Sequence, residues 1–258
     1  MKCRISVKAL LILSVFVTAG FRVNAAEIQK SLLEPQLLQA YEAYQGISNY
    51  QVIFERKETS GNTKSRDEEI FMRFEKPLNL FMKWNTGHSR GQQILFAEGY
   101  FDDKLLVRPP GFLFEFIPIV HLDQDDPRLA EGGEKKSIKH AGIGYFLEKF
   151  AEDYSEAAAS QLVLFSQGDR VDVEGETGQK VIYDFNVPGR EYPHVEIVFS
   201  DEHRMPIEIV MTSADNREEV YRYRNLRADV DRSNPEFKKT ISPKLVKDYQ
   251  QINAPAQQ

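Results

Sequence analysis

Strict alternation of apolar and polar residues over short stretches is the feature that most constrains this fold. In QKVIYDFNV, Val181, Tyr183, Phe185 and Val187 fall on one face, and mostly polar residues fall on the other. HVEIVFSD, PIEIVMTS and EEVYRYRNL follow the same pattern in the second half, as do QVIFE, EEIFMRFEKP and LNLFMKW in the first. A period of two residues is typical of a half-buried strand in an antiparallel sheet.

Turn-forming residues separate these stretches. NTGHSRG and YFDDK interrupt the first half, which also contains the strand-like QQILFAEG and LLVRPPG, whereas Gly189, Pro193, Pro206 and Asp215-Asn216 punctuate the second. The sequence therefore predicts two antiparallel meanders, the first of about five strands. Because each strand has one apolar and one polar face, we expect a sheet that is wet on one side and covered on the other.

Two segments have the helical spacing needed for such a cover. The first begins near Pro35, ends near Gly46, and repeats apolar residues at Leu37, Ala40, Tyr41 and Tyr44. The second follows the stretch HAGIG and runs on through SEAAASQLVLF. Its apolar face comprises Ile143, Phe146, Leu147, Phe150 and Tyr154. Between the meanders, Gly111 to Leu122 is very apolar, and we expect it to line or gate a groove.

The first 25 residues are predicted to be a cleaved export signal. A basic start is followed by the apolar run Ala9–Gly20, which is shorter than the roughly 20 residues of a membrane-spanning helix, and by the small residues Val23-Asn24-Ala25. The sole cysteine, Cys3, precedes that run, so it is neither a lipidation site nor a disulfide partner in the exported chain. Residues 26–252 are expected to form a single domain without a transmembrane segment, and 253–258 a disordered tail.

Charge excludes some classes of partner. The chain has 33 Lys and Arg against 39 Asp and Glu, and the predicted signal contains four bases and no acid. An exported form is therefore more acidic still, which argues against nucleic acid as a partner.

The motifs of common enzymes and cofactor proteins are missing from the sequence. Gly142-Ile143-Gly144 lacks the third glycine of a dinucleotide loop and the Gly-Lys-Ser/Thr of a P-loop, so we interpret it as a tight turn that allows close approach to the sheet. No His-x-x-x-His pair indicates zinc, and HLDQDDP, from His121, is a polar turn rather than a calcium loop. We expect no metal and no cofactor. His140 could act as a general base, but the sequence assigns it no partner.

Several motifs together resemble a known group of proteins. LLQAYEAYQGISNYQVIF, FEKP, MKW, GQQILFAEG, KLLV and YRYRNL occur in an order that resembles the bacterial lipoprotein carriers of the LolA/LppX type. LDQDDPRLAEGGEKKSIKHAGIGYFLEKF is more specifically similar to domain-of-unknown-function family 1571. The resemblance covers most of residues 30–240. It implies an α+β fold, a curved antiparallel sheet or partial barrel with helices across its concave face, together with a hydrophobic cavity and a periplasmic location.

The leading functional hypothesis is a periplasmic or secreted protein, not an enzyme, that holds a lipid, an acyl chain or an apolar peptide segment in a groove between sheet and helices. The candidate ligand-binding residues are Met72, Phe74, Met82, Trp84, Phe114, Phe116, Ile143, Phe146, Leu147 and Phe150. The alternative is an envelope sensor or scaffold that binds protein partners and has a filled core. A third reading is an enzyme on the same fold with His140 in a cleft.

Overall fold

The computed structural model describes residues 28–59, 66–87, 89–110, 119–124, 126 and 138–230. The predicted signal (1–25), the predicted tail (253–258), most of the apolar stretch 111–122, and with it the candidates Phe114 and Phe116, lie outside the described residues. No helix in the described ranges is long and apolar enough to cross a bilayer.

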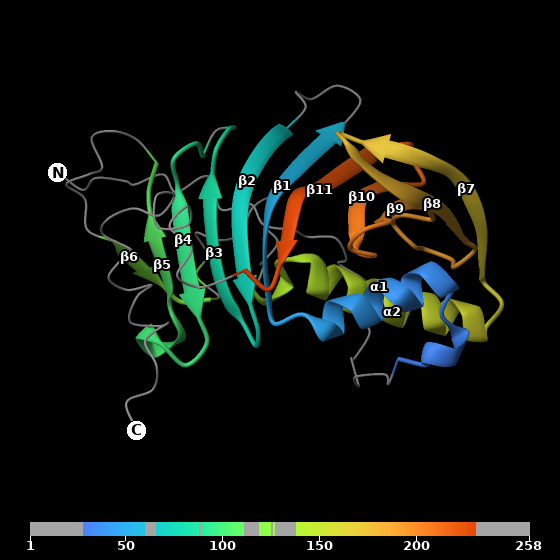
Figure 1. Ribbon diagram of the computed structural model, residues 1–258, viewed down its shortest axis with the longest axis horizontal. Helices are drawn as coiled ribbons and strands as arrows, with labels where there is room; N and C mark the ends of the chain where they lie inside the picture. Colours follow the sequence, from blue (N-terminus) through green and yellow to red (C-terminus); the bar gives the residue numbers. More distant parts are fainter. Residues whose placement is uncertain are drawn as a thin grey trace.

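A single curved sheet of eleven strands forms the described part of the fold (Figure 1). The strand order is β6-β5-β4-β3-β2-β1-β11-β10-β9-β8-β7, and every neighbouring pair is antiparallel. The strands are β1 (Asn49–Thr59), β2 (Arg66–Glu75), β3 (Asn79–Trp84), β4 (Gln93–Ala97), β5 (Leu105–Arg108), β6 (Val120–Leu122), β7 (Val163–Val173), β8 (Glu176–Phe185), β9 (His194–Ser200), β10 (Pro206–Thr212) and β11 (Glu218–Ala228). Two meanders, as predicted, join through the pairing of β1 with β11.

Two helices, α1 (Pro35–Gly46) and α2 (Ile143–Ala159), lie across the concave side of the sheet, which we call the inner face (Figure 1). Short 3-10 turns occur at η1 (Lys30–Leu32), η2 (Phe101–Asp103) and η5 (Ile138–His140). Pro35 takes the first position of α1, where its missing N–H costs nothing. The predicted α+β architecture with a curved antiparallel sheet is confirmed.

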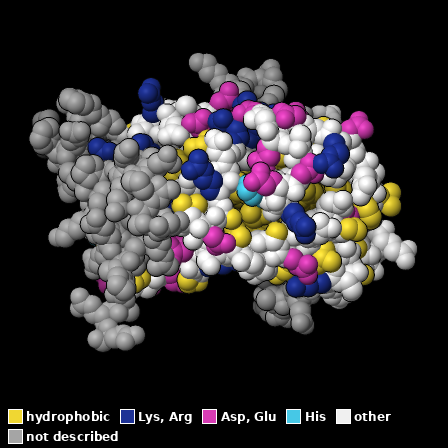
Figure 2. Space-filling model, in the orientation of Figure 1, with side chains coloured by type: hydrophobic (Ala, Val, Ile, Leu, Met, Phe, Trp, Pro, Cys, Tyr) yellow, Lys and Arg dark blue, Asp and Glu magenta, His cyan; other side chains and the backbone are white. Residues whose placement is uncertain are grey.

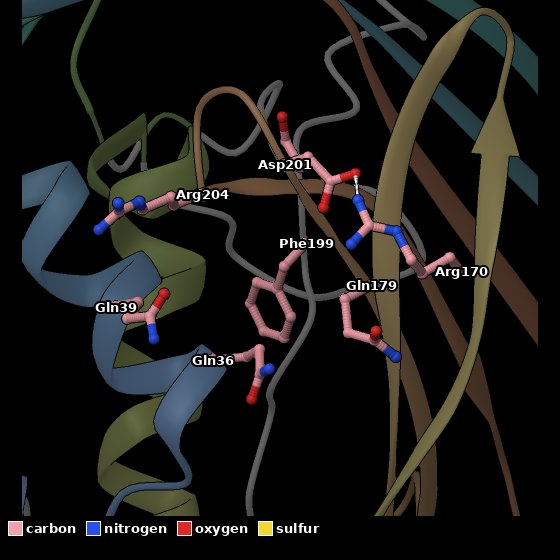
Figure 3. Close-up of a pocket in the computed structure, with 8 residues that line it drawn as sticks. Gln36, Gln39, Arg170, Gln179, Phe199, Asp201 and Arg204 are labelled. Atoms are coloured by element: carbon pink, nitrogen blue, oxygen red, sulfur yellow. Dashed lines mark hydrogen bonds and ion pairs between the residues drawn. The ribbon is translucent and has the colours of Figure 1, made fainter.

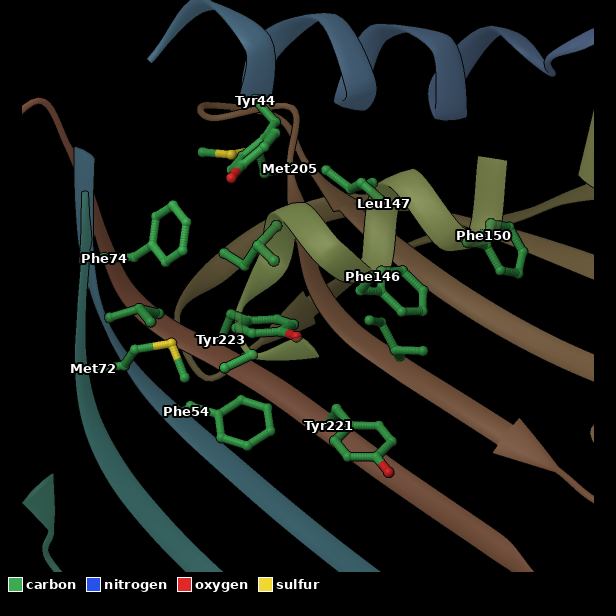
Figure 4. Packing of buried hydrophobic residues seen from close by; sticks show 14 of the residues in the cluster. Tyr44, Phe54, Met72, Phe74, Phe146, Leu147, Phe150, Met205, Tyr221 and Tyr223 are labelled. Atoms are coloured by element: carbon green, nitrogen blue, oxygen red, sulfur yellow. The ribbon is translucent and has the colours of Figure 1, made fainter. Parts of the chain in front are cut away.

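The cross-strand register brings apolar side chains together on the inner face. Met72 on β2 lies opposite Met82 on β3, and Phe54 on β1 lies opposite Tyr223 on β11. Figure 4 shows residues of β1, β2 and β11 facing Phe146 on α2. This single-layer sheet therefore buries its apolar face against helices, as the alternation requires.

The predicted extension of the second helix to Phe165 is wrong. Helix α2 ends at Ala159, Gln161 adopts a positive φ of 56°, and the chain enters β7 at Val163. Both faces of β7 are largely exposed, so this strand has no apolar–polar alternation. Its first residues, VLF, instead extend the apolar spacing of the helix that precedes them.

The prediction that every strand has one wet face is also wrong for β3 to β5. Phe81, Leu95 and Leu106 lie on the outer face and are buried together with Ala97 in a second, smaller apolar cluster. Partly buried Phe71 packs against them. These strands bury both faces, a pattern that gives continuous apolar runs rather than alternation.

Candidate functional site

The eight candidate residues in the described ranges meet in one apolar cluster between the inner face and the helices, which we call the interior. They are Met72 and Phe74 on β2, Met82 and Trp84 on β3, and Ile143, Phe146, Leu147 and Phe150 on α2. Figure 4 shows Met72 and Phe74 on the sheet side and Phe146, Leu147 and Phe150 on the helix side. Each of the eight is at most 6% exposed, so they form packed core rather than the walls of an open groove.

The interior contains every methionine that follows Met1. Met72 and Met82 come from β2 and β3, Met205 precedes β10, and Met211 lies within it. All four are at most 1% exposed. Methionine is unbranched and polarizable, so it adapts to neighbours of irregular shape better than other apolar side chains. The interior is packed, but with side chains suited to repacking.

The start of α2 explains the stretch HAGIG. Gly142 has φ 95° and ψ 169°, a conformation that is essentially restricted to glycine. A Cβ there would lie 2.5 Å from the Tyr50 hydroxyl oxygen, which accepts a hydrogen bond from the Ile143 N–H at 3.0 Å. A Cβ on Gly144 would lie 2.0 Å from Tyr44 Cζ on α1. The predicted close approach is therefore confirmed, and a tyrosine occupies the position where a phosphate loop would hold its anion.

His140 is half-buried and stacks on Tyr145, with ring centroids 4.4 Å apart. Burial lowers the pKa of its imidazole. Within the described ranges, no hydrogen bond or ion pair joins this ring to a carboxylate, so the arrangement offers no partner for a general base. Nor do the described residues contain a cluster of three or more His, Cys, Asp or Glu that could hold a metal ion.

Two buried carboxylates that sequence reasoning did not single out border the interior. Glu34, 2% exposed, accepts hydrogen bonds from the N–H groups of Gln36 (2.9 Å) and Leu37 (3.0 Å) and from the Tyr183 hydroxyl (2.8 Å). It thereby caps α1 and ties it to β8. Burial, followed by the nearby Glu34 charge, raises the pKa of Tyr183, so its hydroxyl remains a donor.

Glu219 on β11 is the second of these carboxylates and is 4% exposed. It accepts hydrogen bonds from the hydroxyls of Tyr192, at 2.5 Å, and Tyr221. Its burial could have been predicted from the sequence, because alternation along β11 places Glu219 on the same inward face as Tyr221 and Tyr223. Both carboxylates are satisfied by hydrogen bonds and act as structural ties.

A small polar pocket of about 200 Å³ opens between α1 and the β7–β10 side of the sheet (Figure 3). Its walls comprise Gln36, Gln39, Arg170, Gln179, Phe199, Ser200, Asp201 and Arg204. Arg170 pairs with Asp201 across it, as the dashed line in Figure 3 marks. The pocket is smaller than the roughly 300–1,000 Å³ of typical ligand sites and is not apolar.

The family model for a protein of unknown function (DUF1571) matches residues 47–245. The chain belongs to this family. The resemblance carried by KHAGIG is thereby confirmed, and in this DUF1571 protein the element has a structural role at the start of α2. No curated protein matches the sequence.

Solved structures similar to this DUF1571 protein include members of the LolA and LppX group. A LolA superfamily protein from Nitrosomonas europaea is 12% identical at a TM-score of 0.39, over 84% of this chain and 99% of its own. Mycobacterium tuberculosis lipoprotein LppX is 11% identical at 0.41, over 79% and 98%. The MucA/MucB complex of Pseudomonas aeruginosa gives 11% at 0.40, over 81% of this chain and 60% of the matched chain. With TM-scores below 0.5, these likenesses carry no conclusion about function.

Proposed function

We propose that this protein of the cell envelope binds an apolar ligand, an acyl chain or an apolar peptide segment, in the interior between the sheet and α2. The observation that carries the proposal is the composition of that interior. Candidate residues from β2, β3 and α2 meet there, and all methionines after Met1 line it. Flexible methionine side chains are a recurrent feature of sites that repack around varied apolar partners.

Because the interior is packed, a guest must displace side chains or part the helices from the sheet. Burying an acyl chain gains about 0.8 kcal/mol per methylene, so a chain of about 14 carbons gains on the order of 10 kcal/mol. Overpacking a core by a methylene or two already costs about 1–3 kcal/mol, so a whole acyl chain must be accommodated by moving a helix away from the sheet rather than by local repacking alone.

Directed hydrogen bonds hold the helices to the sheet at particular points. The Ile143 N–H at the start of α2 donates to Tyr50, Glu34 at the start of α1 accepts from Tyr183, and the Lys76 ammonium donates to the Tyr44 carbonyl oxygen at 2.7 Å near the end of α1. Away from these points Phe146 and its neighbours on α2 make apolar contacts, which have no fixed direction and reform around a guest.

A second candidate is an envelope scaffold or sensor that binds a protein partner. The observation that favours it is the packed state of the same residues, each at most 6% exposed. Such a protein uses its surface rather than its interior.

Trp84 gives a direct test, because it is the only tryptophan, lies in the interior and is fully buried. Delipidated protein is titrated with cis-parinaric acid, which absorbs light where tryptophan emits. The proposal predicts saturable energy transfer from Trp84 at about one probe per chain. Trp84→Phe should abolish the transfer while the probe still binds, as its own emission reports.

Two further variants locate the binding. Met82→Gln, which has nearly the same shape but a polar end, is expected to weaken the probe's affinity, whereas Tyr100→Ser, at an exposed aromatic residue, should leave it unchanged. Circular dichroism checks that each variant is folded. Absence of saturable transfer in folded wild-type protein would contradict the proposal, as would equal effects of the two variants.

A further inference from the structure

Strand β7 forms one end of the sheet (Figure 1). Its only strand neighbour in the described part of the chain is β8. Val163–Val173 spans 11 residues, or about 36 Å at about 3.3 Å per residue. One side of this strand therefore presents backbone N–H and C=O groups that a further strand can pair with.

The first half of β7 exposes apolar side chains beside that free edge. Leu164 is 65% exposed and Phe165 is 48% exposed. Phe165 lies opposite Tyr183 on the inner face, whereas Leu164, opposite Asp184, lies on the outer face. A strand added at this edge would place side chains beside both residues at once, because neighbouring strands align their side chains on each face.

Natural sheets usually protect such edges with charges, proline or bulges. Residues 163–167, VLFSQ, contain no charged residue and no proline, and their pairing with β8 is regular. The register shifts only between Gln167 and Arg170, where charges also begin. The open part of the edge is thus a defined stretch of about five residues, the typical length of a short strand.

Charge at the end of this stretch favours one kind of partner. Asp169 and Asp172 follow the open edge, are exposed, and make no ion pair with any described residue. The one base of β7, Arg170, already pairs with Asp201. Strand β7 itself therefore has two acids and one base, and that base is already paired, so the open edge carries uncompensated negative charge beside its apolar residues. Figure 2 shows charged side chains of both signs mixed on the face in view.

We propose that β7 binds an extended segment of a partner protein by strand addition. The partner's apolar residues lie beside Leu164 and Phe165, and its neighbouring lysine or arginine reaches Asp169 or Asp172. A second copy of this chain fits less well, because it offers these two acids only Arg170, which is already paired. The inference does not depend on ligand binding in the interior.

The test uses the full chain and a fluorescein-labelled peptide with two lysines followed by alternating valine and threonine. Fluorescence anisotropy is expected to show saturable binding. The matched peptide with glutamates in place of the lysines should bind at least tenfold more weakly at low salt, and one with a central proline should not bind. Leu164→Thr combined with Phe165→Thr should weaken binding at least tenfold, while Tyr100→Thr, at another exposed aromatic residue, should not.

Replacing Asp169 and Asp172 with asparagine should remove the preference for the lysine peptide. Since all these positions are exposed, we expect the variants to fold, and circular dichroism checks this. Unchanged peptide binding by the double threonine variant would overturn the proposal. So would sedimentation showing a dimer that this variant abolishes, because the edge would then belong to a second copy.

Discussion

Replacing Gly142 with alanine tests how the start of α2 is fixed to the sheet. The residue has φ 95° and ψ 169°, and an added Cβ would lie 2.5 Å from the hydroxyl oxygen of Tyr50, which is 1% exposed. That hydroxyl also accepts the Ile143 N–H. The substitution therefore strains the backbone and crowds a buried hydroxyl group.

The backbone strain and the crowding together determine how much stability the substitution should cost. Holding a non-glycine residue in this backbone region costs about 1–3 kcal/mol, and overpacking costs about 1–3 kcal/mol. Alanine restricts the unfolded chain and returns about 0.4–1 kcal/mol. We therefore expect Gly142→Ala to lower the free energy of unfolding by about 3 kcal/mol. Gly46→Ala is the matched control, because nothing lies within 4 Å of its added Cβ and its φ is not positive.

Equilibrium unfolding in urea, followed by Trp84 emission, measures these differences. In a Tyr50→Phe background the crowded oxygen is gone, so Gly142→Ala should cost only the backbone strain, about 1–2 kcal/mol. The difference between the two backgrounds isolates the contact between Gly142 and Tyr50. A loss below about 1 kcal/mol in the wild-type background, or the same loss in both, would refute this account of HAGIG.

Three further predictions concern the helices and the outer face. Gly144→Ala should cost about 1–3 kcal/mol in the same urea assay, because its Cβ would lie 2.0 Å from Tyr44 Cζ, and Tyr44→Leu should remove most of that penalty. Glu34→Ala should cost about 1–2 kcal/mol and reduce the hydrogen-exchange protection of the first turn of α1, which loses its cap; unchanged protection would contradict this. Burial lowers the pKa of His194, but the hydrogen bonds and negative charges of Asp184 and Glu196 together outweigh it and raise the pKa above 6.5. Stability from His194 is therefore full below pH 6.5 and lost as pH rises through the raised pKa, so His194→Asn should flatten the dependence of Tm on pH across that window.

Strands with one solvent-exposed face could be predicted from the sequence. Val181, Tyr183 and Phe185 alternate with more exposed residues because β8 packs one face on α2 and turns the other to solvent. Strand β7 could not be predicted, since neither face is well buried and its pairing with β8 alone makes Val163–Phe165 a strand. Strands β3 to β5 exposed neither face, so their alternation was incomplete.

The candidate site was predictable in part. Apolar spacing placed Phe146 and Phe150 on the inward face of α2, and the strand pattern placed Met72 inward on β2. The spacing of apolar residues does not reveal how much space remains between the helices and the sheet, however. The sequence therefore left open whether these residues line a groove or fill a core. The hydrogen-bond partner of the HAGIG turn could not be predicted either, because Tyr50 lies 93 residues before Ile143. Glu219 was one acid among many until the fold buried it.

Native mass spectrometry of the protein, purified without detergent, tests the proposed function most directly. The account predicts a stoichiometric apolar adduct that organic extraction removes and that returns when the stripped protein is incubated with a long-chain fatty acid. Met82→Gln should reduce the fraction of chains that carry the adduct. The claim that the interior holds an apolar ligand would be contradicted if the spectrum showed only the bare chain, both before extraction and after incubation with a fatty acid or an apolar peptide.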